Sequence, residues 1–166
     1  MTTLYSRCPS PLGELLLVGE REAAGPTRLR GLYLPGDRHG PAIDPSWVED
    51  GEAFATITAE LSAYFRGERT TFDLPLDIRG TPFQRRVWAE LERIPFGETV
   101  PYAEVARRIG RPGAARAVGA AVGRNPLSIV VPCHRVIGTG GALTGYGGGL
   151  DRKARLLRHE GDIVAG

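Results

Sequence analysis

A cysteine and a histidine stand side by side in Pro132-Cys133-His134-Arg135-Val136, directly after an apolar run over residues 127–131. Cys133 is one of only two cysteines in the 166 residues. A thiol becomes a strong nucleophile when a nearby base or cation lowers its pKa, and a histidine is such a base. A bare Cys-His pair is more often an inert, buried cysteine beside a surface histidine. The surrounding elements therefore have to decide between the two interpretations.

Composition excludes several classes of protein. The chain is long enough to bury a core, as one domain or two small ones. No stretch approaches a membrane span, and the first residues lack the apolar centre of a signal peptide, so we expect a cytoplasmic protein with no membrane partner. Two cysteines and three histidines without clustered spacing do not fit a protein zinc site. We therefore expect no metal.

Charge divides the chain into an acidic and a basic part. Residues 1–78 carry 7 Arg against 12 Asp or Glu, a net charge of −5, whereas residues 79–166 carry 14 Arg or Lys against 7 acidic residues, a net charge of +7. The window 105–150 has no acidic residue at all. Its arginines are Arg107, Arg108, Arg111, Arg116, Arg124 and Arg135. A polyanionic partner would be attracted to this basic part.

The acidic part predicts a small α+β scaffold without a chemical motif. Apolar residues at helical spacing predict a helix over 52–65. Residues 35–50 are rich in Pro, Gly and Asp and predict a loop. Strands are expected on both sides of a Pro-Leu-Gly turn within 4–18, over 27–34 and over 71–78.

Short helices are predicted in the basic part. Thr81 fits the N-cap and Pro82 the first position of a helix. Two shorter helices are expected over 102–109 and 114–123, joined by a turn that contains glycine. This pattern indicates a helix-turn-helix, and on an acid-free, arginine-rich segment it favours DNA binding.

The chain then leads from the second short helix to the cysteine. Asn125-Pro126 ends that helix, because a residue before proline avoids the helical region. A strand over 127–131 is expected to deliver Cys133. In the glycine-rich stretch that follows, Tyr146 could serve as a stacking wall for a flat ligand. A last helix is expected over 151–159.

Assembled in this order, the motifs resemble those of the methylated-DNA–protein-cysteine methyltransferases, the O6-alkylguanine-DNA alkyltransferase family. The matching motifs lie within residues 81–161, and PCHRV in this context is highly specific; they are PYAEVARRIG, ARAVGAAVGRNP, IVVPCHRVIG, GYGGGL and LLRHEG. SPLGELLL and Ala63-Tyr64-Phe65 match more loosely. The resemblance implies an α+β (α/β) fold. Residues 1–78 would form a ribonuclease-H-like domain, which consists of a small sheet and a helix. A winged-helix-like domain with a helix-turn-helix would follow over 79–166.

The resemblance also implies direct DNA repair. The alkyl group on oxygen 6 of guanine, and less well on oxygen 4 of thymine, would pass irreversibly to Cys133 in a single-turnover suicide reaction without a cofactor. The damaged base would be flipped out through the minor groove, because a duplex hides the alkylated oxygen. The implied partner is double-stranded alkylated DNA. We expect a monomer and leave open whether copies bind DNA cooperatively.

Five residues are implied to carry the chemistry. Cys133 would be the nucleophile, and His134 would take its proton through a water. Glu160 would hold and charge-stabilise the histidine, as the third member of a triad does. Tyr102 would donate a proton toward the departing purine, and the charge of Lys153 would favour the thiolate.

Further residues are implied to contact DNA. Arg116 resembles the arginine finger that fills the space of the extruded base. Asn125 resembles the hinge between the recognition helix and the active-site strand. Ala115, Arg124 and Arg135 are expected to add contacts.

The implied substrate pocket lies around the cysteine and includes Asn125. Backbone carbonyls of Cys133 and Val136 would face the guanine amine. Tyr146 would form a wall, and the amide of Gly147 would lie near oxygen 6.

Two other functions stay open at this point: a DNA-damage sensor that binds the lesion without transferring the group, and a cysteine hydrolase. A hydrolase would leave the acid-free segment unexplained. Non-enzymatic relatives carry tryptophan in place of the cysteine, so the presence of Cys133 favours activity.

Overall fold

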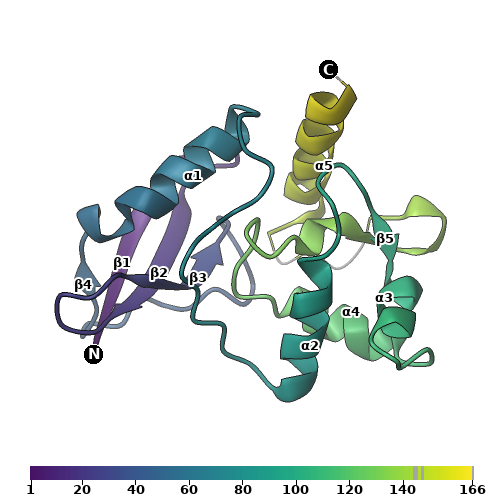
Figure 1. The fold of residues 1–166 in the computed structure, drawn as a ribbon, viewed down its shortest axis with the longest axis horizontal. Helices are drawn as coiled ribbons and strands as arrows, with labels where there is room; N and C mark the ends of the chain where they lie inside the picture. Colours follow the sequence, from purple (N-terminus) through teal and green to yellow (C-terminus); the bar gives the residue numbers. More distant parts are fainter. Residues whose placement is uncertain (144–145, 147, 166) are drawn as a thin grey trace.

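The strands gather in the first part of the chain and the helices in the second, which gives an α+β fold (Figure 1). The structure is a computed structural model that describes residues 1–143, 146 and 148–165. The main sheet has the strand order β3-β2-β1-β4, antiparallel except for the parallel pair of β1 and β4. Its strands are β1 (Thr2–Cys8), β2 (Leu15–Arg21), β3 (Arg28–Tyr33) and β4 (Val48–Glu49).

One helix packs on this sheet. The short 3-10 helix η1 (Glu52–Phe54) leads into α1 (Ala55–Phe65). Ile57, Leu61 and Tyr64 are buried at a spacing of three to four residues and join one core cluster with the leucines of the sheet. The helix expected over 52–65 and the strands expected on both sides of the Pro-Leu-Gly turn and over 27–34 are confirmed. The prediction of a loop over 35–50 is wrong only at Val48–Glu49, which form the short strand β4.

The strand expected over 71–78 is wrong. This segment makes a single bridge, between Leu29 and Leu76. Leu29 donates to the carbonyl of Pro75, and the amide of Asp77 donates back to Leu29. Pro75 has no N–H, so the pairing cannot extend from this bridge toward the start of the segment.

The strand expected over 127–131 is also wrong. It too makes one bridge, between Leu32 of β3 and Leu127. Beyond it, Ile129 has φ +73°, and the amide of Val130 donates to the carbonyl of Ser128. The chain therefore turns where an extended strand was expected, although Leu127 still joins the two parts of the molecule.

Helices with clear local signals form the second part. Thr81 and Gln84 make a capping box at the start of α2 (Pro82–Leu91), with Pro82 at its first position. The helix-turn-helix comprises α3 (Tyr102–Arg108) and α4 (Ala115–Gly123). The indole of Trp88 donates to the carbonyl of Ala121, 2.8 Å away, and so ties α2 to α4.

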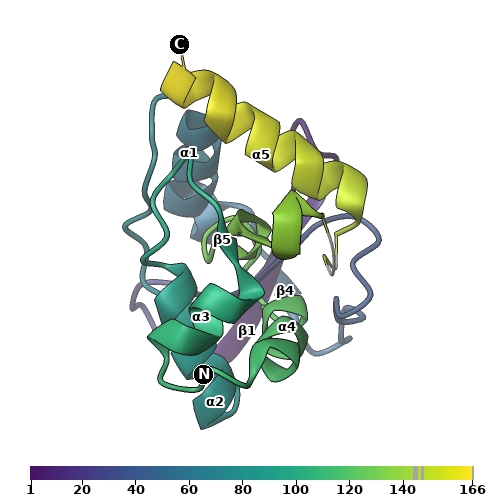
Figure 2. The same ribbon diagram turned by 90° about the vertical axis from the view of Figure 1, so that its right-hand side faces the viewer.

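Short elements surround the cysteine. A two-stranded parallel sheet pairs β5 (Val100–Pro101) with β6 (Val136–Ile137), and neither strand was expected. The 3-10 helices are η2 (Cys133–Arg135) and η3 (Thr139–Gly141). The last helix, α5 (Leu150–Ala165), runs past these elements (Figure 2) and extends beyond the expected end near residue 159.

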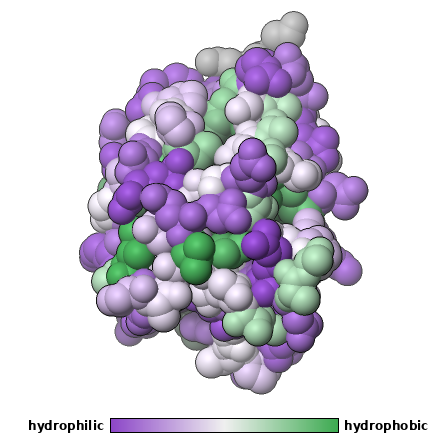
Figure 3. Space-filling view, turned by 90° about the vertical axis from the view of Figure 1, so that its left-hand side faces the viewer, coloured by the Kyte–Doolittle hydropathy of each residue, from purple (hydrophilic) through white to green (hydrophobic). Residues whose placement is uncertain are grey.

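The outer face of the sheet side is mainly hydrophilic, with hydrophobic patches interrupted by polar residues (Figure 3). The apolar side of the sheet thus faces inward, toward α1 and the second part. Among the described residues, no helix is long and apolar enough to cross a membrane.

The capping box can be tested by Thr81→Ala. Loss of the side-chain acceptor for the amide of Gln84 should lower the free energy of unfolding by about 1 kcal/mol. Denaturant melts would measure it. Thr56→Ala, at an exposed position within α1, is the matched control and should leave stability unchanged or slightly raised, because alanine is the better helix former. Equal losses in both variants would contradict the assigned cap.

Candidate active site

Asn125 shapes the loop that leads from α4 to the cysteine. Its amide nitrogen donates to the carbonyl of Val131, 2.8 Å away, and its amide oxygen accepts from the amide of Leu127, 3.0 Å away. The side chain is buried, so both hydrogen bonds are shielded from water. The two hydrogen bonds hold the loop between the end of α4 and Cys133 in shape, and the hinge role of Asn125 stays a prediction.

The same loop contains a strained turn at Ile129. A β-branched residue rarely adopts a φ of +73°, and such strain costs on the order of 1–3 kcal/mol. Ile129 is buried in the core cluster, and that packing holds the turn in place. The position of Cys133 therefore depends on the core beneath it.

Cys133 begins η2 and is buried. Burial raises the pKa of its thiol to about 11, while a hydrogen bond from Asn125 and the charge of Lys153 act in the opposite direction. The charge of Lys153 does lower the pKa of Cys133, as expected, but burial raises this pKa by more. At neutral pH the thiol is protonated, so it needs a base before it can act as a nucleophile.

His134 is placed to act as that base. Its Nε2 lies 2.7 Å from Oε2 of Glu160, and its ring is fully buried. With the proton on Nε2, Nδ1 carries a free lone pair, and Nδ1 has no hydrogen-bond partner among the described residues. Burial lowers the pKa of His134, against the hydrogen bond and charge of Glu160, so the neutral form that can accept a proton is favoured.

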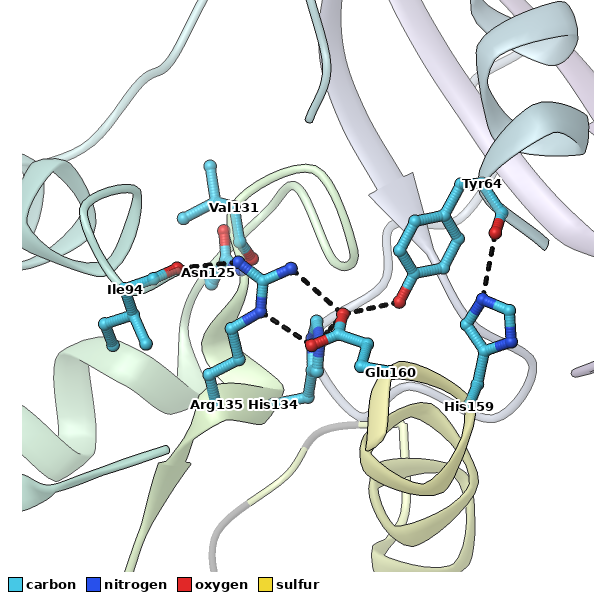
Figure 4. Close-up of polar contacts among 8 residues, drawn as sticks. All are labelled: Tyr64, Ile94, Asn125, Val131, His134, Arg135, His159 and Glu160. Atoms are coloured by element: carbon cyan, nitrogen blue, oxygen red, sulfur yellow. Dashed lines mark hydrogen bonds and ion pairs between the residues drawn. The ribbon is translucent and has the colours of Figure 1, made fainter. Parts of the chain in front are cut away.

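Glu160 is a buried carboxylate with several donors (Figure 4). Burial alone would raise its pKa, but hydrogen bonds and charges from His134 and Arg135 hold the pKa well below its usual range. The carboxylate is therefore ionised and can stabilise a positive charge on the imidazole of His134.

Tyr64 is a member of this site that the sequence argument missed. Its hydroxyl donates to Oε2 of Glu160 across 2.6 Å, from α1 to α5 (Figure 4). Sequence motifs around the cysteine could not reveal it, because the two residues are 96 positions apart. The only signal was the loose resemblance of the segment Ala63-Tyr64-Phe65.

Lys153 and Tyr102 lie close together near the cysteine. The ammonium of Lys153 donates to the carbonyl of Val136, 2.6 Å away, and lies 5.8 Å from the centroid of the Tyr102 ring. Burial lowers the pKa of Lys153 to about 8, and the charge of Cys133 opposes this shift. The carbonyl of Val136 keeps a second lone pair for another donor.

Tyr146 is buried, as a pocket wall requires, whereas Gly147 lies outside the described residues. A surface hollow of about 430 Å³ lies beside Tyr146, between the loop after β3 and the start of α5. It is lined by Pro35, Gly36, Arg38, Tyr146, Gly148, Gly149, Leu150 and Arg152.

Two exposed arginines lie on and just after α4. Val118, Ala121 and Val122 bury its inner face, so Arg116 points away from the core and is exposed. Arg124, just after the helix, is exposed as well, and Ala115 at its start is half-buried. These positions suit contacts with a nucleic acid backbone or groove.

Comparison with known proteins accounts for both parts of the chain. The family model "6-O-methylguanine DNA methyltransferase, ribonuclease-like domain" matches residues 3–78. The model "6-O-methylguanine DNA methyltransferase, DNA binding domain" matches residues 82–162. The chain belongs to the 6-O-methylguanine DNA methyltransferase family. The resemblance inferred from the sequence is confirmed, as is the expected order of a ribonuclease-like and a DNA-binding domain.

Relatives within this family are similar over nearly their whole length. The chain is 53% identical to a methylated-DNA–protein-cysteine methyltransferase of Mycolicibacterium paratuberculosis, over 94% of this chain and 91% of that protein. A relative of the same name from Methanosarcina acetivorans is 46% identical, over 95% and 97%. A crystal structure of Mycobacterium tuberculosis OGT in complex with DNA superposes with a TM-score of 0.86 at 48% identity, over 96% of this chain and 94% of that one.

Arg135 corrects one prediction. It was expected to contact DNA, but its side chain is buried. Its guanidinium donates from Nε to Oε1 and from a terminal nitrogen to Oε2 of Glu160, at 2.8 and 3.0 Å, and also to the carbonyl of Ile94 at 2.7 Å. It further packs over the ring of Phe96. Charge counting along the sequence could not separate this buried arginine from the exposed ones.

Because Arg135 is buried and Arg124 is exposed, we expect Arg135→Ala to lose stability and Arg124→Ala to lose affinity for DNA. Removing Arg135 leaves a buried carboxylate with fewer partners and should lower the free energy of unfolding by about 3–5 kcal/mol. Arg124→Ala should leave the melting temperature nearly unchanged but weaken DNA binding, because Arg124 is exposed. Thermal melts and gel shifts on the folded fraction measure both. Weaker DNA binding without loss of stability in Arg135→Ala would restore the original prediction.

Proposed function

We propose that this protein repairs DNA directly, by transferring the alkyl group from oxygen 6 of guanine in duplex DNA to Sγ of Cys133. The observation that supports this proposal best is the buried Cys133-His134-Glu160 arrangement, which one short loop joins to α4 with the exposed Arg116. Relatives about half identical to this chain are named methylated-DNA–protein-cysteine methyltransferases, which supports that activity here. Oxygen 4 of alkylated thymine is a poorer substrate.

The reaction begins with removal of the thiol proton. A water relays this proton from Cys133 to Nδ1 of His134, and Glu160 stabilises the imidazolium that forms. The thiolate attacks the alkyl carbon in line, so that a sulfur–carbon bond forms as the carbon–oxygen bond breaks. The electron pair remains on guanine, which takes up a proton from Tyr102. Lys153 lies near enough to favour the thiolate while the proton is being moved.

The thioether formed is a poor leaving group, so each molecule acts once. Cys8, the other cysteine, lies at the end of β1 and is buried, and it forms no disulfide. It offers no route to regenerate the first thiol. Transfer is therefore stoichiometric and needs no cofactor.

DNA is bound through the domain over residues 79–166. Arg116 enters the minor groove and occupies the space of the flipped base, while Ala115 and Arg124 contact the backbone. Asn125 connects this helix to the pocket formed with Val136, Tyr146 and Gly147. A relative, Mycobacterium tuberculosis OGT, has been solved in complex with DNA, which supports DNA as the partner of this chain. The protein acts as a cytoplasmic monomer, with residues 1–78 as the first domain.

Mass spectrometry after incubation with O6-methylguanine DNA tests the reaction. We expect one methyl group per protein, located on Cys133 and not on Cys8. Cys133→Ala should lose all transfer yet keep its affinity for DNA, since binding comes from exposed arginines such as Arg116 and Arg124. Cys8→Ala is the matched control and should transfer normally. Binding without any adduct would indicate a damage sensor, and repeated turnover would indicate a hydrolase.

Salt dependence tests the role of Arg116. DNA binding should weaken steeply with salt, because counterions are released from phosphates. Arg116→Ala should impair base flipping, followed by a fluorescent base analogue, more than it changes the salt slope. Arg66→Ala, in the first domain beside Glu68, should change neither. A slope reduced by about one with normal flipping would assign Arg116 to a phosphate contact instead.

A further inference from the structure

Two uncharged donors meet at one oxygen of Glu160 (Figure 4). Nε2 of His134 lies 2.7 Å and the hydroxyl of Tyr64 lies 2.6 Å from the same atom, Oε2. Arg135 holds the carboxylate as a fork, with one nitrogen on Oε1 and another on Oε2. The fork fixes the orientation of the carboxylate, so Tyr64 is not needed for that purpose.

The position of the Tyr64 hydroxyl is firmly determined. Its side chain is 0% exposed, and its ring packs against Phe65, Phe72 and Phe96 at centroid distances of 5.1, 5.5 and 6.0 Å. Its backbone carbonyl lies 2.9 Å from Nε2 of His159 on α5. Burial and the charge of Glu160 raise the pKa of Tyr64 far above its usual value, so the hydroxyl stays a donor at every working pH.

A hydrogen bond to a carboxylate oxygen disperses part of its negative charge. Oε2 therefore attracts a proton on His134 less strongly than it would without the hydroxyl of Tyr64. We propose that Tyr64 is a positioning residue of the first domain that acts through Glu160: its hydroxyl weakens the hold of the carboxylate on the imidazolium form of His134 and keeps Nδ1 free to accept the thiol proton. This role rests on the alkyl transfer proposed above.

The groups around His134 allow this effect to be isolated. Glu160 favours its charged form, whereas Arg135 on η2 and Lys153 on α5 disfavour it. Cys133 precedes it in η2, with a thiol that is protonated at neutral pH. Tyr64 reaches this set from α1 by its hydrogen bond to Glu160, and the charge of Arg135 also acts on it. Removing its hydroxyl therefore removes the hydrogen bond to Glu160 and leaves the two cations in place.

The experiment is the pH dependence of single-turnover transfer in Tyr64→Phe. Loss of the hydroxyl should raise the pKa of His134 and move the acid limb of the profile upward by about half a pH unit. Rates on that limb should fall about 3-fold, while the plateau at higher pH should stay within about 2-fold of wild type. The reaction amplitude reports the folded fraction separately. Tyr5→Phe, on β1, is the matched control and should leave the whole profile unchanged.

Two further measurements separate positioning from a structural role. In a Glu160→Gln background, Tyr64→Phe should no longer move the acid limb, because its route to His134 is gone. The titration of the His134 ring, followed by NMR, should shift upward in Tyr64→Phe, and this readout does not require transfer.

The outcomes are distinct. An unmoved acid limb and His134 titration, or an equal fall in rate at every pH, would overturn the role of Tyr64. So would a variant with no folded fraction, since the hydroxyl would then be a requirement for folding. If wild-type protein places no alkyl group on Cys133, the proposed function fails, and the NMR titration alone decides whether Tyr64 acts on His134.

Discussion

A single buried carboxylate, Glu160, holds the reaction centre together. Burying a charge costs several kcal/mol unless hydrogen bonds and opposite charge compensate for it. Here the compensating groups come from α1, through Tyr64, and from η2, through His134 and Arg135. The carboxylate is satisfied only when these segments, which are remote in sequence, have come together. The contact of α1 with η2 through Glu160 and the placement of His134 beside Glu160 therefore depend on each other.

The second constraint is the path from the DNA-binding helix to the thiol. Trp88 fixes the end of α4 through the carbonyl of Ala121, and Asn125 fixes the loop that follows. Between Asn125 and Cys133 the chain makes a strained turn at Ile129 and touches β3 through Leu127. Only a few residues thus separate α4 from Cys133, and the core of the first domain packs against the loop between them. The first domain is more than a scaffold, because it supports this loop and supplies Tyr64.

Local sequence signals predicted the elements that local interactions determine. The capping box at Thr81, the turn between α3 and α4 and the PCHRV motif all depend on neighbouring residues. The strands expected over 71–78 and 127–131 failed because a proline and a left-handed residue interrupt ladders whose partners are remote. Arg135 and Tyr64 were misjudged or missed for the same reason: burial and a contact across 96 positions leave no mark in a linear pattern.

The high pKa of the resting thiol suits a nucleophile that is used once. A protonated, buried thiol reacts slowly with oxidants and stray electrophiles, since the thiolate is the reactive form. In the reaction proposed above His134 takes this proton, and a thiolate of high basicity is then the stronger nucleophile, because nucleophilicity rises with thiol pKa. Burial of Cys133 therefore lowers the fraction of thiolate at rest and raises its intrinsic reactivity when formed. In the proposed reaction the balance depends on how readily His134 accepts a proton, which burial opposes and Glu160 favours.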